Sequence, residues 1–262
     1  MILKPEDALL AEAVFQRRSV RSFQLKKPDE RAVAALRSEI SYATSRDAAI
    51  HFQLFLNDPS PFEGFTAGYG MYRNARHYVA CVVDTSYEDC MQRAGYWAEK
   101  VALRAVSKGL GTCFVSGTYK SDSVAAQLRV TWRIPFILLV GYESDRRNTL
   151  MARMMKGLAG SARRPSAASV LSSDSMSYEE VLKQWPELQK PLEAVAAAPS
   201  SMNRHPARIC IQPGDTPDMP RITAKVNKEY AQSDIDLGIA LCNWQIVAGG
   251  EWEYGPEPLW LD

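Results

Sequence analysis

The segment Arg17-Arg18-Ser19-Val20-Arg21-Ser22-Phe23 carries three arginines and two hydroxyl side chains within seven residues. It follows residues 6–16, where apolar side chains recur at helical spacing. Guanidinium groups are permanently charged and present forked donors, so arginines at the end of a helix can bind a phosphate. Taken alone, the segment is more typical of a solvated basic turn, and its interpretation depends on the rest of the chain.

A second segment, residues 198–203, reads Ala-Pro-Ser-Ser-Met-Asn. It is a short polar loop between an alanine-rich segment and an alternating segment at 208–212. Its hydroxyl and amide groups could hydrogen-bond a polar ligand chain. On its own, the loop is more typical of an ordinary turn that ends a helix.

Helices and strands alternate along the first half of the chain. Apolar spacing predicts helices over 6–16, 29–42 and 91–108, with Pro28 opening the second and Gly109 ending the third. Apolar runs predict strands over 50–56, 78–84, 112–115 and 136–142. This alternation predicts an α/β or α+β fold.

The second half begins with a serine-rich segment, 159–177, which predicts a loose connector. Helices are predicted over 178–184 and 192–198, with Pro186 and Pro191 as breaks, followed by a strand over 208–212 and a helix over 233–248. The remaining tail contains Trp252, Tyr254 and Trp260 and is expected to cover the core.

Composition narrows the function classes. The 262 residues suit one large domain or two small ones, and the net charge of +1 argues against nucleic acid as the main partner.

The five cysteines form no C-x-x-C pair, which predicts buried free thiols, and the three histidines lack the spacing of metal ligands. No apolar run approaches the ~20 residues of a membrane span, so a cytoplasmic protein is expected. P-loop, dinucleotide-binding and G-x-S-x-G motifs are absent from the sequence.

Considered together, the motifs resemble those of the FMN-dependent nitroreductase family. The family's opening motif, Arg-Arg/His-Ser-x-Arg/Lys-x-Phe, is matched by residues 17–23, and its loop Ala-Pro-Ser-x-x-Asn-x-Gln-Pro-Trp is echoed by residues 198–206. Its Gly-Leu-Gly-x-x-x-x-x-Gly unit is matched by Gly109-Leu110-Gly111 and Gly117, and its late basic segment by Arg163-Arg164-Pro165. The resemblance covers most of residues 8–172 and 178–212.

The order of these motifs is unusual for that family. In typical members the Pro-Ser-x-x-Asn loop follows soon after the arginine motif, and the partner subunit of a two-fold dimer supplies it to each flavin. In this chain the loop comes about 180 residues later. The chain therefore resembles the tandem branch of the family, a fused pseudo-dimer. That resemblance implies an α+β, three-layer α-β-α fold with an antiparallel or mixed sheet and two pseudo-repeats, a first half at 1–172 and a shortened second half at 173–262.

The resemblance also implies FMN as the cofactor. Arg17, Ser19 and Arg163 resemble the phosphate-binding positions. Arg21 resembles the cation beside the pyrimidine end of the isoalloxazine ring, where positive charge favours the reduced flavin. The full set of implied FMN-binding residues is Arg17, Arg18, Ser19, Arg21, Ser116, Gly117, Arg163, Arg164, Pro199, Ser200, Ser201 and Asn203.

Three departures from the family pattern affect the predicted site. Ser116 stands where family members often have an acidic residue, and the Gln-Pro-Trp end of the loop is His205-Pro206-Ala207. A polar residue that contacts the ring in some members aligns near Gly68, within a glycine-rich stretch at 64–70. This stretch is interpreted equally well as a substrate-side loop and as a flexible connection.

The implied activity is a ping-pong transfer of hydride from NAD(P)H through FMN to an electron-poor small molecule such as a nitroarene or a quinone. No side chain is assigned a catalytic role, no metal is expected, and the protein is expected to be a monomer or a homodimer. Two alternatives remain: a degenerate family member that binds a flavin or another ligand without turnover, and an interaction protein of this fold that binds no flavin.

Overall fold

A computed structural model describes residues 5–63, 71–144, 164–216, 219–227 and 230–261, with side chains from residue 8 onward. The chain divides into two compact units. We call Gln16–Cys90 with Lys100–Ala162 the central unit, and Met1–Phe15 with Met91–Glu99 and Arg163–Asp262 the C-terminal unit. The division into halves at 1–172 and 173–262 stays a prediction.

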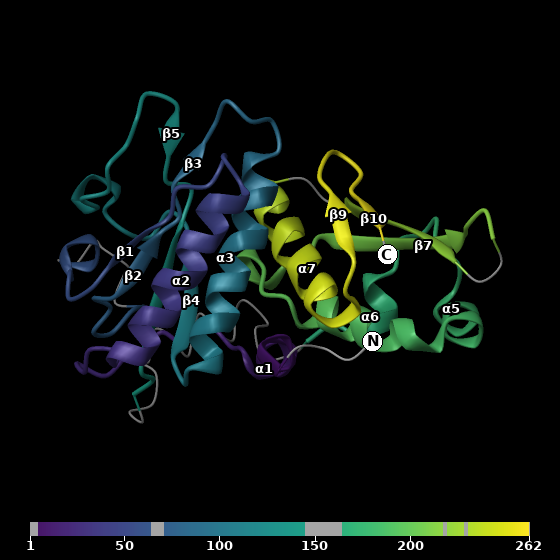
Figure 1. The fold of residues 1–262 in the computed structure, drawn as a ribbon, viewed down its shortest axis with the longest axis horizontal. Helices are drawn as coiled ribbons and strands as arrows, with labels where there is room; N and C mark the ends of the chain where they lie inside the picture. Colours follow the sequence, from purple (N-terminus) through teal and green to yellow (C-terminus); the bar gives the residue numbers. More distant parts are fainter. Residues whose placement is uncertain (1–4, 64–70, 145–163, 217–218, 228–229, 262) are drawn as a thin grey trace. The chain divides into compact units, whose positions relative to one another are not determined.

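The central unit is built on a four-stranded antiparallel sheet in the order β1-β2-β6-β4. Its strands are β1 (Gln53–Phe55), β2 (Tyr78–Ala80), β4 (Gly111–Val115) and β6 (Ile137–Gly141). Helix α2 (Glu30–Arg46) lies beside α3 (Cys90–Ser107) (Figure 1). In the C-terminal half of α3, Arg104 pairs with Glu39 of α2 at 2.8 Å. Every residue of β6 is buried, so the sheet forms the centre of this unit's core.

Local sequence explains how the helices of this unit begin and end. Asp29 is the N-cap of α2, and its carboxylate accepts a hydrogen bond from the Ala32 amide at 2.8 Å. Gly109 follows α3 with a φ of 76°, a conformation that glycine adopts without steric cost. The next strand, β4, begins two residues later and runs beside β6.

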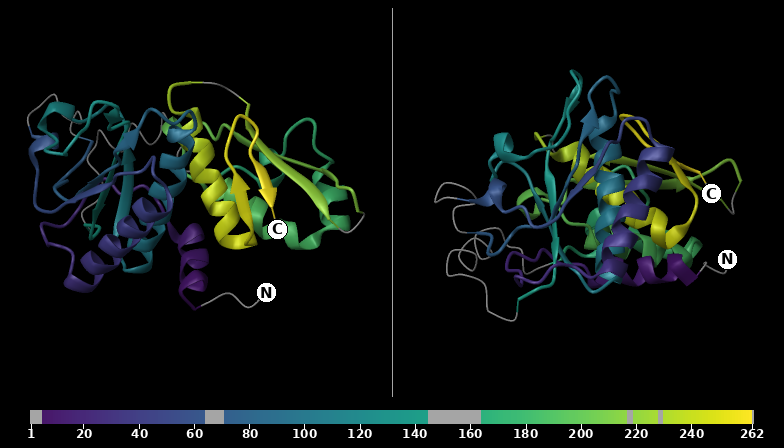
Figure 2. Two further views of the ribbon diagram at one scale, coloured as in Figure 1. Left: turned by 45° about the horizontal axis from the view of Figure 1, so that its top comes forward. Right: turned by 60° about the vertical axis from the view of Figure 1, so that its left-hand side comes forward.

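The C-terminal unit has its own antiparallel sheet in the order β7-β8-β10-β9. Its strands are β7 (Ala207–Pro213), β8 (Pro220–Val226), β9 (Glu251–Glu253) and β10 (Leu259–Leu261), and its helices are α1 (Pro5–Gln16, assigned here up to Phe15), α5 (Tyr178–Gln184), α6 (Gln189–Ala197) and α7 (Ser233–Ala248). Helix α7 lies beside this sheet (Figure 2). The Trp244 ring centroid is 6.1 Å from those of Trp252 in β9 and Trp260 in β10.

Helices α3 and α7 touch through backbone atoms within the C-terminal unit. A Cβ atom added at Gly95 would lie 2.0 Å from the carbonyl oxygen of Ile235. One added at Gly238 would lie 1.8 Å from the carbonyl oxygen of Gln92. Only glycine allows this close approach, so the packing of the two helices depends on both positions.

Antiparallel sheets covered by helices confirm an α+β fold. The five cysteines are all buried thiols, as predicted. The predicted pair of pseudo-repeats stays a prediction.

The structure differs from the predicted elements at three points: the run at 78–84, Pro191 and β8. The apolar run at 78–84 is broken after Ala80, and β3 (Val83–Asp84) pairs instead with β5 (Trp132–Arg133) in a separate two-stranded sheet. Pro191 does not break the helix, because it lies in the first turn of α6, where proline is tolerated. Strand β8 was not predicted. The tail forms β9 and β10, a hairpin that extends the β7-β8 sheet, and its Trp252 and Trp260 rings pack against the buried Trp244.

The described part of the serine-rich segment is also more regular than a loose connector. It contains a 3₁₀ turn at Ala167–Val170, and Leu171 pairs with Ile209 in a parallel bridge. Further 3₁₀ turns occupy Ser60–Phe62, Ser121–Ser123, Pro186–Leu188 and Ser201–Asn203.

Candidate functional site

The arginine segment lies along the sheet of the central unit. The Val20 amide donates to the carbonyl oxygen of Thr112 in β4 at 2.8 Å, and the Phe23 amide donates to that of Arg73 at 3.0 Å. Val20 and Phe23 are buried in the same core as Tyr78 and Leu139. These backbone and core contacts hold residues 17–23 in place, so the arginines project from a fixed segment.

Three of the predicted phosphate and ring residues gather around one thiol. Burial raises the pKa of Cys113, which is 2% exposed, while the positive charges of Arg21 and Arg17 and a hydrogen bond with Ser19 oppose that rise. Arg17 is itself only 5% exposed. Two guanidinium groups and a hydroxyl at one place form a donor set that suits a phosphate or another anion.

Arg18 has a different partner from its neighbours. Its guanidinium pairs with the Glu143 carboxylate just beyond β6, and both side chains are largely exposed to solvent. An exposed ion pair of this kind contributes little to stability. Arg18 is therefore the arginine of the segment with the least connection to the group around Cys113.

The predicted turn at Ser116-Gly117 lies near the same group. Gly117 has a φ of 75°, and the next residue, Thr118, has its Oγ1 atom 3.3 Å from the Tyr72 hydroxyl. Burial and, to a smaller extent, the neighbouring Cys113 raise the pKa of Tyr72 to about 12, against the opposing effects of the hydrogen bond with Thr118 and the positive charge of Arg21. These contacts connect the turn after β4 with Arg21 through Tyr72.

We call this group the arginine cluster; it consists of Arg17, Ser19, Arg21, Tyr72, Cys113 and Thr118. The sequence motif identified its arginines and its serine but not Tyr72 or Thr118. Tyr72 is separated from the arginine motif by about 50 residues, and only the position just after the glycine-rich 64–70 stretch could have drawn attention to it.

The Pro-Ser-x-x-Asn loop belongs to the C-terminal unit and has an unusual backbone. Met202, Asn203 and His205 have φ values of 52°, 57° and 46°, in the left-handed region that non-glycine residues seldom adopt. The Ser200 hydroxyl accepts the His205 amide at 2.8 Å, and the His205 ring lies 2.9 Å from the Asn203 side-chain oxygen. The loop therefore has one defined conformation, stabilised by its own side chains.

A buried carboxylate that the sequence did not reveal anchors the loop from outside. The Ser201 amide donates to both oxygens of Asp236, at 3.1 and 2.9 Å, and the Tyr230 hydroxyl donates to the same carboxylate. Asp236 is 5% exposed and lies in the first turn of α7. Burial raises its pKa to about 6, against the opposing effect of Tyr230, Ser201 and Arg204.

The structure describes the late basic segment from Arg164 onward. Arg163 lies outside the described residues, as does the stretch 64–70 with Gly68. Arg164 donates from Nη2 to the carbonyl oxygen of Phe15 at 3.0 Å, in the last turn of α1. A cation at that end of a helix binds a carbonyl without an intrahelical partner, which gives Arg164 a capping role within the C-terminal unit.

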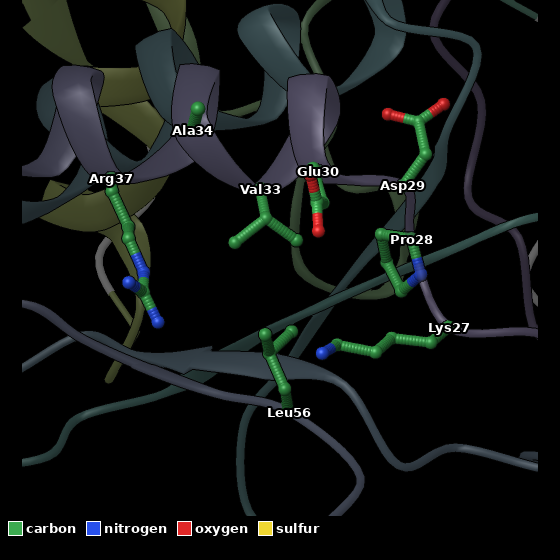
Figure 3. Close-up of a pocket in the computed structure, with 8 residues that line it drawn as sticks. All are labelled: Lys27, Pro28, Asp29, Glu30, Val33, Ala34, Arg37 and Leu56. Carbon is green, nitrogen blue, oxygen red and sulfur yellow. The ribbon is translucent and has the colours of Figure 1, made fainter.

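A cavity of about 500 Å³ in the central unit is separate from the arginine cluster. It lies between the start of α2 and the end of β1; Lys27 and Arg37 reach toward it, and Val33 and Leu56 form its apolar walls (Figure 3). None of the predicted site residues lines it. Its exposed Arg37 therefore provides a control position for experiments on the cluster.

The described residues contain no group of three or more histidine, cysteine, aspartate or glutamate side chains that could hold a metal ion. None of the helices described is both long enough and apolar enough to cross a bilayer.

Comparison with solved structures gives matches in fold to nitroreductases. A "putative nitroreductase" from Thermotoga maritima has a TM-score of 0.60 and 21% identity, over 96% of this chain and 93% of that chain. Nitroreductase A from Vibrio parahaemolyticus has a TM-score of 0.46 and 13% identity, over 71% and 85%. A nitroreductase with bound FMN from Bacteroides fragilis has a TM-score of 0.44 and 14% identity, over 53% and 91%.

Comparison with curated proteins gives no match. The sequence profile of the family described as "Putative TM nitroreductase" matches residues 9–248, which is most of the chain and includes both the arginine segment and the Pro-Ser-x-x-Asn loop. The protein therefore belongs to this nitroreductase family.

Proposed function

We propose that this protein is an FMN-dependent oxidoreductase that passes hydride from NAD(P)H, through FMN, to an electron-poor acceptor such as a nitroarene or a quinone. Membership of a nitroreductase family supports an oxidoreductase. The observation that carries the FMN assignment is the arginine cluster, because it combines fixed cations and a hydroxyl on the segment that resembles the flavin motif.

The donors in the cluster fit the FMN phosphate. Arg17 and Ser19 supply charged and neutral donors, and a hydrogen bond to a charged group contributes about 1.5–3 kcal/mol. Burial of Arg17 limits competition from water and strengthens its attraction to a dianion. Arg163 is proposed for the same phosphate on the resemblance alone.

Arg21 is proposed to act on the flavin ring. Bound FMN would accept and donate hydride, and this chemistry belongs to the cofactor. Negative charge develops on the pyrimidine part of the ring during reduction, so a fixed cation there stabilises the reduced form. Arg21 is partly buried and has Tyr72 and Cys113 as neighbours, which restricts its position.

The remaining roles follow the resemblance. Pro199, Ser200, Ser201 and Asn203 are proposed to contact the ribityl chain and the ring, and the Ser116-Gly117 turn to face the central ring with a backbone N–H. The left-handed conformation of Asn203 presents its side chain on a loop that is already ordered, so little conformational entropy would be lost on binding.

The test is the absorbance spectrum of freshly purified protein, followed by NAD(P)H oxidation with a quinone or a nitroarene. Yellow protein that consumes NAD(P)H only when an acceptor is present supports the proposal. Flavin binding without turnover for any acceptor would favour the degenerate, ligand-binding alternative. Colourless protein that does not bind added FMN would exclude the proposed function and favour an interaction protein of this fold.

A further inference from the structure

We propose that Asp236 is a positioning residue, whose charged carboxylate holds the loop at 199–205 in the conformation that binds the flavin. The proposal rests on the proposed function, since it concerns the same ligand. It assigns no contact between Asp236 and the flavin. Asp236 would act only through the backbone of Ser201.

The first argument is the position of the hydrogen bond. Ser201 is the first residue of the 3₁₀ turn Ser201–Asn203, in which the Asn203 amide donates to Ser200 at 3.1 Å and the Arg204 amide to Ser201 at 3.2 Å. The amide at the start of such a turn has no partner inside it. Asp236 accepts this amide with both carboxylate oxygens and so fixes where the turn begins.

The second argument is the strain in the residues that follow. Met202 and His205 are not glycine, yet both have positive φ values, and such residues persist only when surrounding contacts define them. The Ser200 hydroxyl and the Asn203 side chain define the end of the loop through His205. Asp236 is the acceptor that defines its beginning.

The third argument concerns the charged and titratable side chains near the Asp236 carboxylate, because they determine what its protonation would change. The Tyr230 hydroxyl donates to Asp236, and the Arg204 guanidinium lies 4.5 Å from the centre of the Tyr230 ring. On α7 itself, Asp234 is exposed to solvent. From α3, the guanidinium of Arg93 lies over the Tyr254 ring, 4.8 Å from its centre.

One further titratable side chain belongs to the loop. Burial lowers the pKa of His205, and the positive charge of Arg208 lowers it further, so both effects disfavour a charged His205 ring. The donors to Asp236 are neutral groups, the Ser201 amide and the Tyr230 hydroxyl, and Arg204 is the nearby cation that lowers the pKa of Asp236. Protonation of Asp236 would replace a charged acceptor of the Ser201 amide with a weaker neutral one.

Burial raises the pKa of Asp236 into a pH range in which flavin binding can be measured. Because its pKa is raised to about 6, the carboxylate is charged at pH 7.5 and mostly protonated at pH 5. Flavin affinity should therefore fall about fivefold to tenfold between these pH values, as expected when a charged hydrogen bond becomes a neutral one.

The experiment measures riboflavin affinity against pH by fluorescence quenching. Riboflavin replaces FMN because the phosphate has its own ionisation near pH 6. Asp236→Asn should bind riboflavin weakly, with little change between pH 5 and 7.5. Tyr230→Phe should move the wild-type inflection to higher pH, because the Tyr230 hydrogen bond lowers the pKa of Asp236. Asp234→Asn, which alters an exposed acid two residues away, is the matched control and should retain the wild-type profile.

A second measurement separates this proposal from the proposed function. Amide hydrogen exchange at Ser201, compared at pH 7.5 without flavin, should be at least tenfold faster in Asp236→Asn than in the wild type or Asp234→Asn. Unchanged exchange at Ser201, or riboflavin affinity that Asp236→Asn leaves intact, would overturn the positioning role. Wild-type protein that binds neither riboflavin nor FMN, while Ser201 exchange responds as expected, would instead refute the proposed function.

Discussion

Gly238 of α7 lies directly against the carbonyl oxygen of Gln92 in α3, with only 1.8 Å between that oxygen and the place where a Cβ atom would stand. A Cβ atom at Gly95 of α3 would likewise lie 2.0 Å from the carbonyl oxygen of Ile235 in α7. This reciprocal contact places the first turn of α7, and with it Asp236, on a rigid support within the C-terminal unit. The position of the loop that Asp236 anchors therefore depends on the packing of α3 against α7.

Replacing Gly238 with alanine is expected to destabilise the protein, although glycine-to-alanine changes within helices usually stabilise by up to about 1 kcal/mol. The added methyl group would require α3 and α7 to separate, and overpacking of this kind costs about 1–3 kcal/mol or more. Urea unfolding measures the change. Ser38→Ala, on the exposed side of α2, is the control and should stay within about 0.5 kcal/mol of the wild type. A more stable Gly238→Ala protein would contradict the close helix contact.

Arg21→Ala should lower the midpoint potential of the bound flavin, because it removes the cation proposed to stabilise the reduced ring. A loss of about 1.4 kcal/mol corresponds to about 30 mV for a two-electron couple. Spectroelectrochemical titration measures it. Arg37→Ala removes an arginine from the separate cavity of the central unit and should leave the potential unchanged. An unaltered potential in Arg21→Ala would remove Arg21 from this role.

Arg17→Ala should weaken FMN binding about 10- to 100-fold, since a hydrogen bond to a charged group contributes about 1.5–3 kcal/mol. Riboflavin, which lacks the phosphate, should be affected much less. Arg18→Ala is the neighbouring comparison, and it should have a smaller effect on FMN because Arg18 pairs with Glu143 at the surface. Equal losses for FMN and riboflavin in Arg17→Ala would argue against a phosphate contact.

Asn203→Gly should weaken flavin binding, because it removes an amide side chain that is proposed to contact the flavin and that also bonds the His205 ring at 2.9 Å. Asn203 has a φ of 57°, which glycine adopts freely, so the substitution removes the amide side chain without imposing strain. Met202→Gly makes the same change at the adjacent residue, whose φ is 52° and whose side chain is 66% exposed. The two variants should therefore differ in flavin affinity by the contribution of the Asn203 side chain. Similar affinities would show that this side chain does not contact the flavin.

Asp236 should also give stability a characteristic pH dependence. Burial raises its pKa from 3.8 to about 6, so between these pH values the folded protein holds a proton that the unfolded chain has released. Its contribution to the free energy of unfolding therefore falls as the pH rises from about 4 to 6, by about 3 kcal/mol. The measured quantity is the difference in stability between the wild type and Asp236→Asn across this range. A difference that stays constant with pH would show that Asp236 titrates normally.

Long periodic elements of this fold could be predicted from the sequence. Helices α3 and α7 have apolar residues at helical spacing over several turns, and β6 is a continuous apolar run, so local pattern and tertiary environment agree. Strand β8 was missed because its apolar side chains are few and small, and they alternate with Arg221, Thr223 and Lys225. The break after Ala80 was missed because both strands of the run are buried, and composition alone does not show where a backbone leaves a sheet.

The candidate site was predictable only where a motif is continuous in sequence. The arginine segment and the Pro-Ser-x-x-Asn loop are such motifs, and each has a defined conformation. Tyr72 and Asp236 act through partners that are 35 or more residues away, Thr118 and Ser201, so no local pattern marks them. An aspartate in the first turn of a helix is ordinarily exposed and interacts with the positive end of the helix dipole. Asp236 is buried instead, and this burial, which the sequence does not show, indicates its different role.

Helix α3 supplies residues 91–99 to one unit and 100–107 to the other, and the C-terminal unit combines the first 15 residues with the last hundred. During synthesis, the unit that contains the amino-terminal helix therefore cannot be completed until nearly the whole polypeptide has left the ribosome. Neither unit corresponds to a contiguous gene fragment. Expression of either half separately should yield chains dependent on chaperones, and premature termination should leave apolar surface uncovered.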